Sequence, residues 1–447
     1  MDPLLATLVL ILVALLGARV SFSTPRAPAG PRLLLRTGTP FLLVGFALGP
    51  VGLGLLPQEA TRQLFPMLAL GLGWVGFHFG LQLDRQALAL FPWTHHVLAV
   101  GQALLTLAFF FVATWGIMWL AGLEGTVPLL VALIASCTAS VTTPAGIAMV
   151  SSSFKVKGTV RDLLFFVASV DAVVGIMALQ AVYAFFRGEA VAAEILGVPQ
   201  LTFVALALGL GLICGIVFLW LSRSRPAPEE LILYLLGICA FAAGAALQWG
   251  LSPLFVSVVM GAVVANLARD RQRILLVLER WEKPVYLSFL LIAGALLRFE
   301  TWWVLPIAVG YALLRSAAKV AGTAAVVRVL PLPDEVPRRL GLGLIPQGGI
   351  SIAMAVSGTL VYSELLVGSV DAEAVLFAVI VVGVMLSELL GPFLTIRLLR
   401  ETGEISPRVV EALVAGDERA AEKEAIRHAT PGAEAGDDAP GPGDGAA

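Results

Sequence analysis

Long apolar stretches are the feature that most constrains the fold of this chain. A helix that crosses the hydrocarbon core of a bilayer needs about 20 largely apolar residues, and about 13 such stretches follow one another before residue 400. They lie near residues 4–20, 39–57, 64–82, 95–120, 127–150, 161–186, 200–221, 231–249, 253–268, 284–298, 303–328, 338–362 and 373–397. The sequence therefore predicts an all-α polytopic membrane protein with about 13 transmembrane helices.

The distribution of basic residues predicts the orientation of these spans. Lys and Arg concentrate in cytoplasmic loops of membrane proteins. With 13 spans, 20 basic residues of the loops fall on one side, and three fall on the other, namely Arg62, Arg187 and Arg298. We therefore predict an inner (plasma) membrane protein with its N-terminus outside and its C-terminus in the cytoplasm. No basic residue precedes the first apolar stretch, so we interpret it as a retained helix rather than a signal peptide.

The composition changes after residue 400. Residues 1–400 form the predicted transmembrane domain, whereas residues 401–447 are rich in charged residues, Ala, Gly and Pro. Such a segment buries too little apolar surface to fold alone. We predict a largely disordered cytoplasmic tail with a short helix over about 407–428. A regulatory docking segment is the alternative interpretation.

Two of the predicted spans contain residues that interrupt a helix. The stretch 127–150 holds a run of hydroxyl residues before Pro144 and Gly146, and the stretch 338–362 holds the residues Pro346, Gln347, Gly348 and Gly349. Proline removes a backbone donor, and paired broken helices in the two halves of a transporter mark its binding site. The sequence therefore predicts two broken, crossing helices. The alternative is that these residues only kink packing helices.

The spacing of the two broken spans predicts how the halves are related. They are the fifth and twelfth spans, so the offset is seven, and an odd offset places two repeats in opposite orientations across the membrane. The second span, around Gly45, is also weakly similar to the ninth, around Gly261. We therefore expect an inverted repeat.

Ionisable residues deep in an apolar span are costly and indicate function. Counted from the cytoplasmic end at about 1.5 Å per residue, Asp171 lies roughly 15 Å deep, and Lys319 and Glu388 lie roughly 13 Å deep. Arg315 lies one turn from Lys319 on the same face of its helix. The sequence thus predicts that Lys319, Arg315 and Glu388 are charge partners of Asp171.

These residues suit the exchange of a proton for a small cation. A buried carboxylate such as Asp171 can hold either one, and a neighbouring lysine can pair with it when neither is bound. Thr138, Thr142 and Thr143, in the first broken span, offer further oxygen ligands. The metal at this site would be transported Na⁺ or K⁺. A buried ion-pair network that only holds helices together is the alternative.

Several function classes lack support in the sequence. No catalytic triad order, phosphate loop or metal-ligand spacing is found, so we predict neither an enzyme nor a bound cofactor. Basic and acidic residues nearly balance, 29 against 31, which excludes a polybasic surface for nucleic acid. We expect Na⁺ or K⁺, H⁺ and the lipid bilayer as partners.

Residues 1–405 resemble the monovalent cation/proton antiporters, and more closely their bacterial antiporter-2 branch. Phe77 to Asp84 is similar to the Phe-x-x-Gly-Leu-x-x-Asp stretch of that branch, and Asp171 matches the acidic residue of its ion-binding helix. Thr142-Thr143-Pro144 is similar to its Thr-Asp-Pro break, and Lys319 falls at its basic residue.

The resemblance implies a homodimer with two parts in each protomer. A core of residues 95–186 and 303–397 would move against a scaffold of residues 4–82 and 200–298, and Asp171 would bind cation and proton in turn. Val170 and Thr143 stand where many members have Asn or an acidic residue. This difference favours electroneutral one-for-one exchange.

Two other functions remain open at this stage. A sodium-coupled organic-anion symporter of similar inverted-repeat fold would use polar residues such as Gln347 in sodium sites. A non-transporting membrane sensor that signals through its tail would show no ion flux.

Overall fold

The described part of the chain is entirely helical. A computed structural model of the chain describes residues 12–13, 38–56, 63–191, 199–299, 302–333, 336–362, 370–414, 420 and 424. Seven helices in these ranges are long and apolar enough to cross a membrane, and four further apolar helices are shorter, with 10 to 17 residues. Most of the predicted first span, 4–20, lies outside the described residues, so the figure of about 13 crossings stays a prediction.

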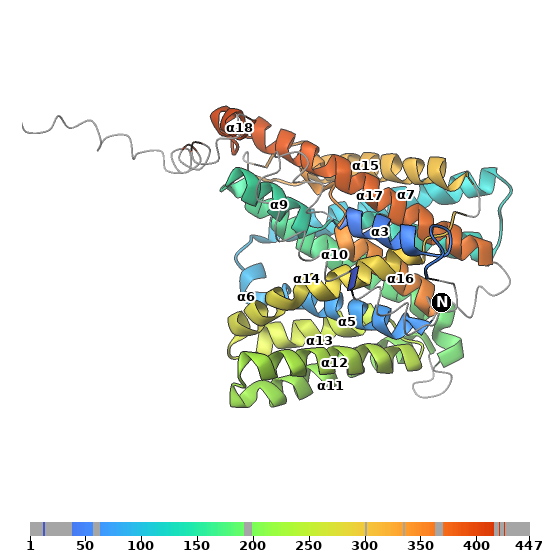
Figure 1. Cartoon of the computed structure of the whole chain (residues 1–447). Coiled ribbons are helices and arrows are strands. Elements are labelled where there is room, and N and C mark those ends of the chain that lie inside the picture. Colours follow the sequence, from blue (N-terminus) through green and yellow to red (C-terminus); the bar gives the residue numbers. More distant parts are fainter. Residues whose placement is uncertain are drawn as a thin grey trace, which may run out of the picture.

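The helices follow the predicted spans closely (Figure 1). In chain order they are α3 (Thr39–Leu48), α5 (Phe65–Leu81), α6 (Arg85–Leu88), α7 (Trp93–Leu120), α8 (Thr126–Ser140), α9 (Pro144–Phe154), α10 (Thr159–Val191), α11 (Pro199–Leu221), η1 (Ser222–Ser224), α12 (Pro228–Gln248), α13 (Pro253–Leu267), α14 (Arg271–Ala295), α15 (Val304–Val329), η2 (Leu340–Leu344), α16 (Gly348–Tyr362), α17 (Val370–Glu401) and α18 (Pro407–Val414).

Two helices differ from the predicted ranges. The helix α14 begins at Arg271 rather than near residue 284, because an apolar-stretch criterion leaves out its charged first turns; Pro284 lies inside it. The helix α3 ends at Leu48, and turns continue to residue 56. Both differences arise because hydropathy reports how favourably residues partition into lipid and does not report backbone conformation.

The order of helix contacts follows the predicted inverted repeat. The helix α3 packs against α14, and α5 packs against α13. An offset of seven spans converts α3 into α13 and α14 into α5, so the two pairs are equivalent. In the same way, α10 contacts both α8 and α9, and α17 contacts both η2 and α16.

Glycines bring the paired helices into backbone contact. Gly45 lies against the Leu291 carbonyl and Gly294 against the Leu42 carbonyl, so a Cβ at either glycine would overlap backbone atoms of the α3–α14 pair. Gly80 and Gly261 form the equivalent contact between α5 and α13. We call these two contacts the glycine seams. Their matching geometry supports the equivalence of the two spans that the weak sequence similarity around Gly45 and Gly261 suggested.

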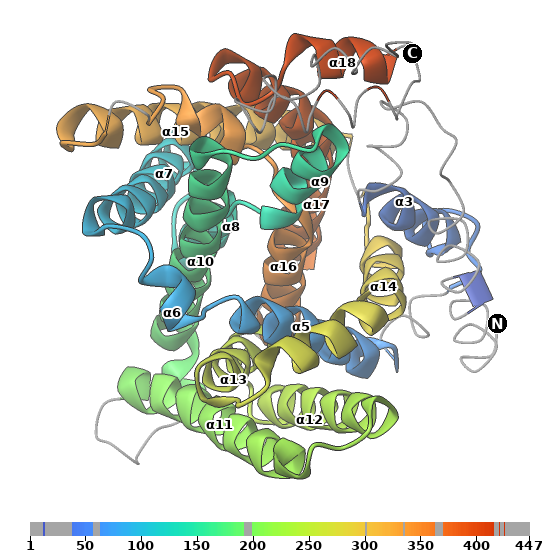
Figure 2. The ribbon, with the colours of Figure 1, turned by 90° about the vertical axis from the view of Figure 1, so that its left-hand side faces the viewer.

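The two broken helices lie together in the interior. Figure 2 shows α11, α12 and α13 forming one end of the molecule, while α7 and α15 lie at the opposite end, with α8, α10, α16 and α17 between them.

Figure 1 shows that α6, the end of α9 and α18 lie at the same end of the bundle. The predicted tail helix, 407–428, is described only over α18 and at residues 420 and 424.

Candidate functional site

The first broken helix stops where the hydroxyl residues end. The helix α8 ends at Ser140, the next residues are extended, and α9 starts at Pro144, where a proline is well tolerated as the first helical residue. The interruption leaves the amide of Thr142 without a helical partner. That amide donates a 3.0 Å hydrogen bond to Asp171 Oδ1, so the break itself supplies a ligand to the carboxylate.

The second break lies directly against the first. The short helix η2 ends at Leu344, and α16 begins at Gly348, whose φ of 54° suits glycine. The Thr143 amide donates to the Pro346 carbonyl at 3.1 Å, and the Thr142 hydroxyl donates to the Leu344 carbonyl at 2.9 Å. Gly146 also has no room for a Cβ beside Pro346. The two breaks therefore form one crossing, as the sequence predicted.

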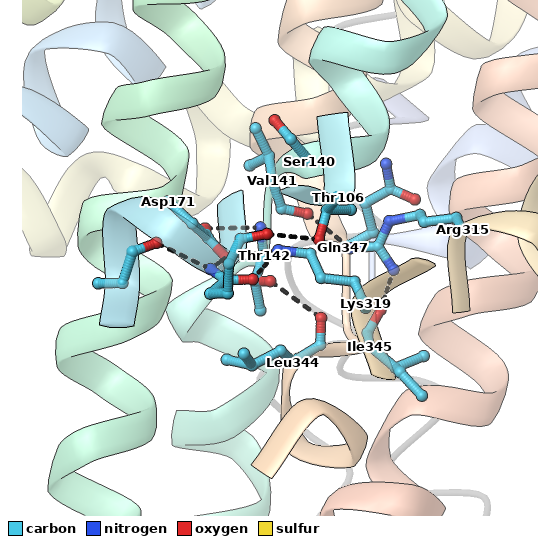
Figure 3. Close-up of polar contacts among 12 residues, drawn as sticks. Thr106, Ser140, Val141, Thr142, Asp171, Arg315, Lys319, Leu344, Ile345 and Gln347 are labelled. Atoms are coloured by element: carbon cyan, nitrogen blue, oxygen red, sulfur yellow. Dashed lines mark hydrogen bonds and ion pairs between the residues drawn. The ribbon is translucent and has the colours of Figure 1, made fainter. Parts of the chain in front are cut away.

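Arg315 holds the carbonyl ends at this crossing. It lies fully buried in α15 and donates to the Val141 carbonyl at 2.6 Å and to the Ile345 carbonyl at 2.7 Å (Figure 3). Both carbonyls belong to interrupted helix ends, where a cation is favourable. The hydrogen bonds of Arg315 are thus with backbone, while its charge lies within electrostatic range of Asp171. Its role as a charge partner of Asp171 stays a prediction.

Asp171 and Lys319 form a buried ion pair beside the crossing. Lys319 Nζ lies 2.7 Å from Asp171 Oδ2, and both side chains are fully buried. Gln102, in α7, joins them: its Nε2 donates to Asp171 Oδ2 at 3.2 Å, and its Oε1 accepts from Lys319 Nζ at 3.3 Å. We call Asp171, Lys319, Gln102 and the Thr142 amide the Asp171 cluster. Figure 3 shows Asp171, Thr142 and Lys319 pointing toward one another.

A cavity borders this cluster. Its volume is about 740 Å³, and Thr143, Pro144 and Ser169 form part of its wall. Thr143 is the neighbour of Thr142, and Ser169 lies two residues before Asp171. The remaining wall comes from α5, α9, α10, α14 and the start of α16, and it includes His78, Arg271, Glu279, Glu282 and Tyr286. Asp171 itself is fully buried and does not line the cavity.

Other predicted site residues lie outside the cluster. The Thr138 hydroxyl donates to the Ala135 carbonyl at 2.8 Å and lies 3.2 Å from the Tyr311 hydroxyl. Gln347, together with Gly348 and Gly349 at the start of α16, belongs to the crossing; its Nε2 donates to the Thr138 carbonyl at 2.8 Å and to the Tyr311 hydroxyl at 2.9 Å. These contacts join the two broken helices through side chains.

Glu388 is separate from the Asp171 cluster. Its Oε2 accepts a 2.8 Å hydrogen bond from the Thr39 hydroxyl of α3. The predicted depth of Glu388 in its span agrees with its burial. Depth does not determine which neighbouring helix the side chain faces. Sequence reasoning also missed Gln102, an uncharged polar residue in an otherwise apolar stretch.

The comparisons with known proteins agree with this geometry. The sequence profile of the family described as "Sodium/hydrogen exchanger, transmembrane" matches residues 11–401. The chain belongs to this family. It is therefore a multi-pass membrane transporter of the cation/proton exchanger class and not an enzyme.

Among solved structures, the chain is similar to the sodium proton antiporter MjNhaP1 from Methanocaldococcus jannaschii, determined at pH 8. The TM-score is 0.64 at 16% sequence identity, and the match covers 89% of this exchanger and 100% of that chain. This likeness confirms the predicted antiporter fold. No curated protein sequence matches the exchanger.

Proposed function

We propose that the exchanger carries Na⁺ in one direction and H⁺ in the other, with Asp171 binding the two ions in turn. The observation that carries this proposal is the buried Asp171–Lys319 pair at the crossing of two broken helices. A buried pair is seldom more stable than apolar residues of the same size, so a role in transport explains why the charges are there. Both comparisons name sodium, which favours Na⁺ over K⁺.

The geometry supports a specific competition at the carboxylate. Lys319 Nζ contacts two oxygens, Asp171 Oδ2 at 2.7 Å and Gln102 Oε1 at 3.3 Å. A Na⁺ ion that displaces the ammonium group keeps both oxygens as ligands, and hard cations prefer such oxygen ligands. Lys319 stabilises the carboxylate when neither ion is bound. A proton on Asp171 removes the attraction that holds the ammonium group there.

One carboxylate in the cluster supports electroneutral exchange. Within the described residues, Asp171 is the only acidic side chain hydrogen-bonded to Lys319 or to the Thr142 amide. A site that holds one cation or one proton in turn exchanges them one for one. We therefore propose a stoichiometry of one Na⁺ per H⁺.

We further propose how the molecule lies in the membrane and moves. The wall of the cavity includes Gln82 and Arg271, and Arg271 pairs with Asp84 at the start of α6. At this end of the bundle lie α6 and the end of α9, with Arg85 and Lys155, and basic residues favour the cytoplasmic side. The described conformation is then open toward the cytoplasm, with the C-terminus on that side, in the plasma membrane. Alternating access would move the core, 95–186 and 303–397, against the scaffold. A homodimer stays a prediction from the family resemblance.

Ion flux in proteoliposomes tests the proposed function. Vesicles with an internal pH dye receive pulses of Na⁺ or K⁺ at pH values from about 6 to 9, a range that brackets the shifts of a buried carboxylate. We expect Na⁺ pulses to move protons with the wild-type protein and not with Asp171→Asn. Asp162→Asn is the matched control, because Asp162 lies on the same helix but is exposed and paired with Arg161. It should retain exchange.

The same measurement separates the alternatives. Proton movement with K⁺ but not Na⁺ would keep the antiporter and change its cation. Flux that needs an organic anion would favour the symporter, although the Gln347 amide group already bridges Thr138 and Tyr311. No flux under any condition would overturn the proposed exchange and leave the sensor interpretation.

A further inference from the structure

A second buried carboxyl group lies outside the Asp171 cluster. Glu388, in α17, is 9% exposed, and its hydrogen bond from Thr39 is its only one among the described residues. Of the ion pairs between described residues, none includes Glu388. In contrast to Asp171, Glu388 therefore has no basic partner among the described residues.

An unpaired carboxylate cannot stay charged in such a place at low cost. Moving an isolated charge into an apolar environment costs far more free energy than one hydroxyl hydrogen bond returns. The group then takes up a proton or a cation. One side-chain hydroxyl is too few oxygen ligands for a cation, whereas it suffices for a protonated carboxyl group. The contacts of Glu388 thus favour bound H⁺.

The other groups near Glu388 are also acidic or neutral. Tyr286, in α14, is within electrostatic range of Glu388 and of Glu282. Its hydroxyl lies against Gly349, at the start of α16, and near Gly38, which precedes Thr39. The helix α14 also carries Arg280 and Lys283, and α15, which packs on α17, carries Arg315 and Lys319. The interactions of Glu388 with described residues include none of these charges. Tyr286 also lines the 740 Å³ cavity, so a cavity-lining side chain lies within electrostatic range of the carboxyl group.

The position of Glu388 links it to the crossing. Gly391, less than one turn later in α17, packs so closely on Pro346 that it has no room for a Cβ. On the other side, α3 is fixed to α14 through the glycine seam. The Thr39–Glu388 hydrogen bond therefore joins α17, which packs on the second break, to the α3–α14 pair. Movement of α17 relative to α3 must break it.

We propose that Glu388 is a second proton-binding site, distinct from Asp171, and that its protonated form holds α17 against α3. Loss of this proton leaves a charge that separates the two helices as it becomes hydrated, which permits α17 to move. Low pH then favours the described conformation, and rising pH favours the conformations in which α17 has moved away from α3. This inference rests on the proposed function in one respect, namely that transport requires α17 to move relative to α3.

Infrared difference spectroscopy tests the proton site without measuring transport. The full-length protein in lipid is titrated, and the carbonyl stretch of a protonated carboxyl group is followed. We expect a band in the wild type that is absent in Glu388→Gln and retained in Asp171→Asn. The matched control, Glu401→Gln, lies on the same helix but pairs with Arg397 at the surface and should keep the band. A spectrum of Glu388→Gln identical to that of the wild type would overturn the proposal.

The pH profile of exchange tests whether loss of the Glu388 proton permits α17 to move. Glu388→Gln imitates the protonated group, so its exchange should stay slow as the pH rises. Thr39→Val removes the hydrogen bond, so its activation should move to lower pH by about one unit, a tenfold change in proton affinity; Thr39→Ser should restore the wild-type profile. Unchanged profiles in Glu388→Gln and Thr39→Val, beside an active wild type, would overturn the release. An inactive wild type would instead overturn the proposed function, while the infrared band still decides the proton site.

Discussion

Two buried carboxyl groups occupy equivalent helices of the inverted repeat and have opposite surroundings. Asp171 lies in α10 and Glu388 in α17, and each of these helices contacts both halves of a broken helix. Asp171 has the Lys319 ammonium group, the Gln102 amide and the Thr142 amide around it. Glu388 has one hydroxyl, from Thr39.

The difference arises on the neighbouring helices. The helix α15 carries Arg315 and Lys319 four residues apart, whereas its repeat equivalent, α7, carries Gln102 and Thr106 at the same spacing. Both positive charges therefore lie at the crossing, next to Asp171, and none of the described ones reaches Glu388. A symmetric backbone thus holds an asymmetric charge distribution, in line with the proposal that Glu388 is the carboxyl group that holds a proton.

Removing the positive charge beside Asp171 should have the largest effect. Lys319→Met leaves a buried carboxylate unpaired, which costs about 3–5 kcal/mol of stability. Adding Asp171→Asn to it should restore most of the lost stability, because neither charge then remains. Thermal unfolding of the purified protein in detergent measures both. If Lys319→Met and the double variant unfold at the same temperature, Lys319 does not serve as the counter-charge of Asp171.

Substitution of Arg315 should have the second largest effect, because Arg315 donates hydrogen bonds to both interrupted helix ends. Arg315→Met leaves the Val141 and Ile345 carbonyls without their donor, at a cost of about 2 kcal/mol or more. We expect the exchange rate to fall about tenfold or more, equivalent to about 1.4 kcal/mol. Arg315→Lys keeps the charge but loses the forked geometry and should recover only part of the rate. Full activity in both variants would show that the crossing does not need this contact.

Substitution of Gln102 should have a smaller effect, which appears in the apparent affinity for the cation. Gln102→Leu removes one proposed oxygen ligand, so the apparent KM for Na⁺ should rise about tenfold, equivalent to about 1.4 kcal/mol. Gln180→Leu is the matched control, because Gln180 is buried in α10 with neither amide atom hydrogen-bonded. Its KM should stay at the wild-type value. Equal KM values in the two variants would remove Gln102 from the ion site.

The contact of Glu388 should contribute least to stability. Thr39→Val removes one hydrogen bond to a neutral carboxyl group and should cost about 1 kcal/mol. The shift in unfolding temperature should therefore be well below that of Lys319→Met. A loss as large as that of Lys319→Met would mean that Glu388 is charged here, and the contrast between the two carboxyl groups would fail.

Much of the site was visible in the sequence because charges in apolar spans are rare. Asp171 and Lys319 stood out on that ground, and the structure brings them to 2.7 Å. The breaks at Pro144 and Pro346 were visible for the same kind of reason, since Pro and Gly interrupt a helix. The offset of seven spans then related the two halves, and the contacts of α3, α5, α13 and α14 follow it.

The rest depended on contacts between distant residues. Residue spacing gives the depth of Glu388 but not the helix that it faces, so its partner Thr39, 349 residues away, was not found. The Thr138 and Thr142 hydroxyls donate to the Ala135 and Leu344 carbonyls, partners that residue spacing alone does not identify. A hydroxyl that donates its proton keeps its oxygen lone pairs, so the prediction that these oxygens bind a cation stays a prediction.

The glycine seams have a mechanical consequence. Where two backbones touch, no side chains lie between them that could change rotamer, so the contact has few alternative arrangements and resists sliding. The pairs α3–α14 and α5–α13 should therefore behave as stiff units under load. Any deformation during the working cycle then concentrates where side chains contact side chains, and between α3 and α17 one such contact is the hydrogen bond of a single threonine hydroxyl.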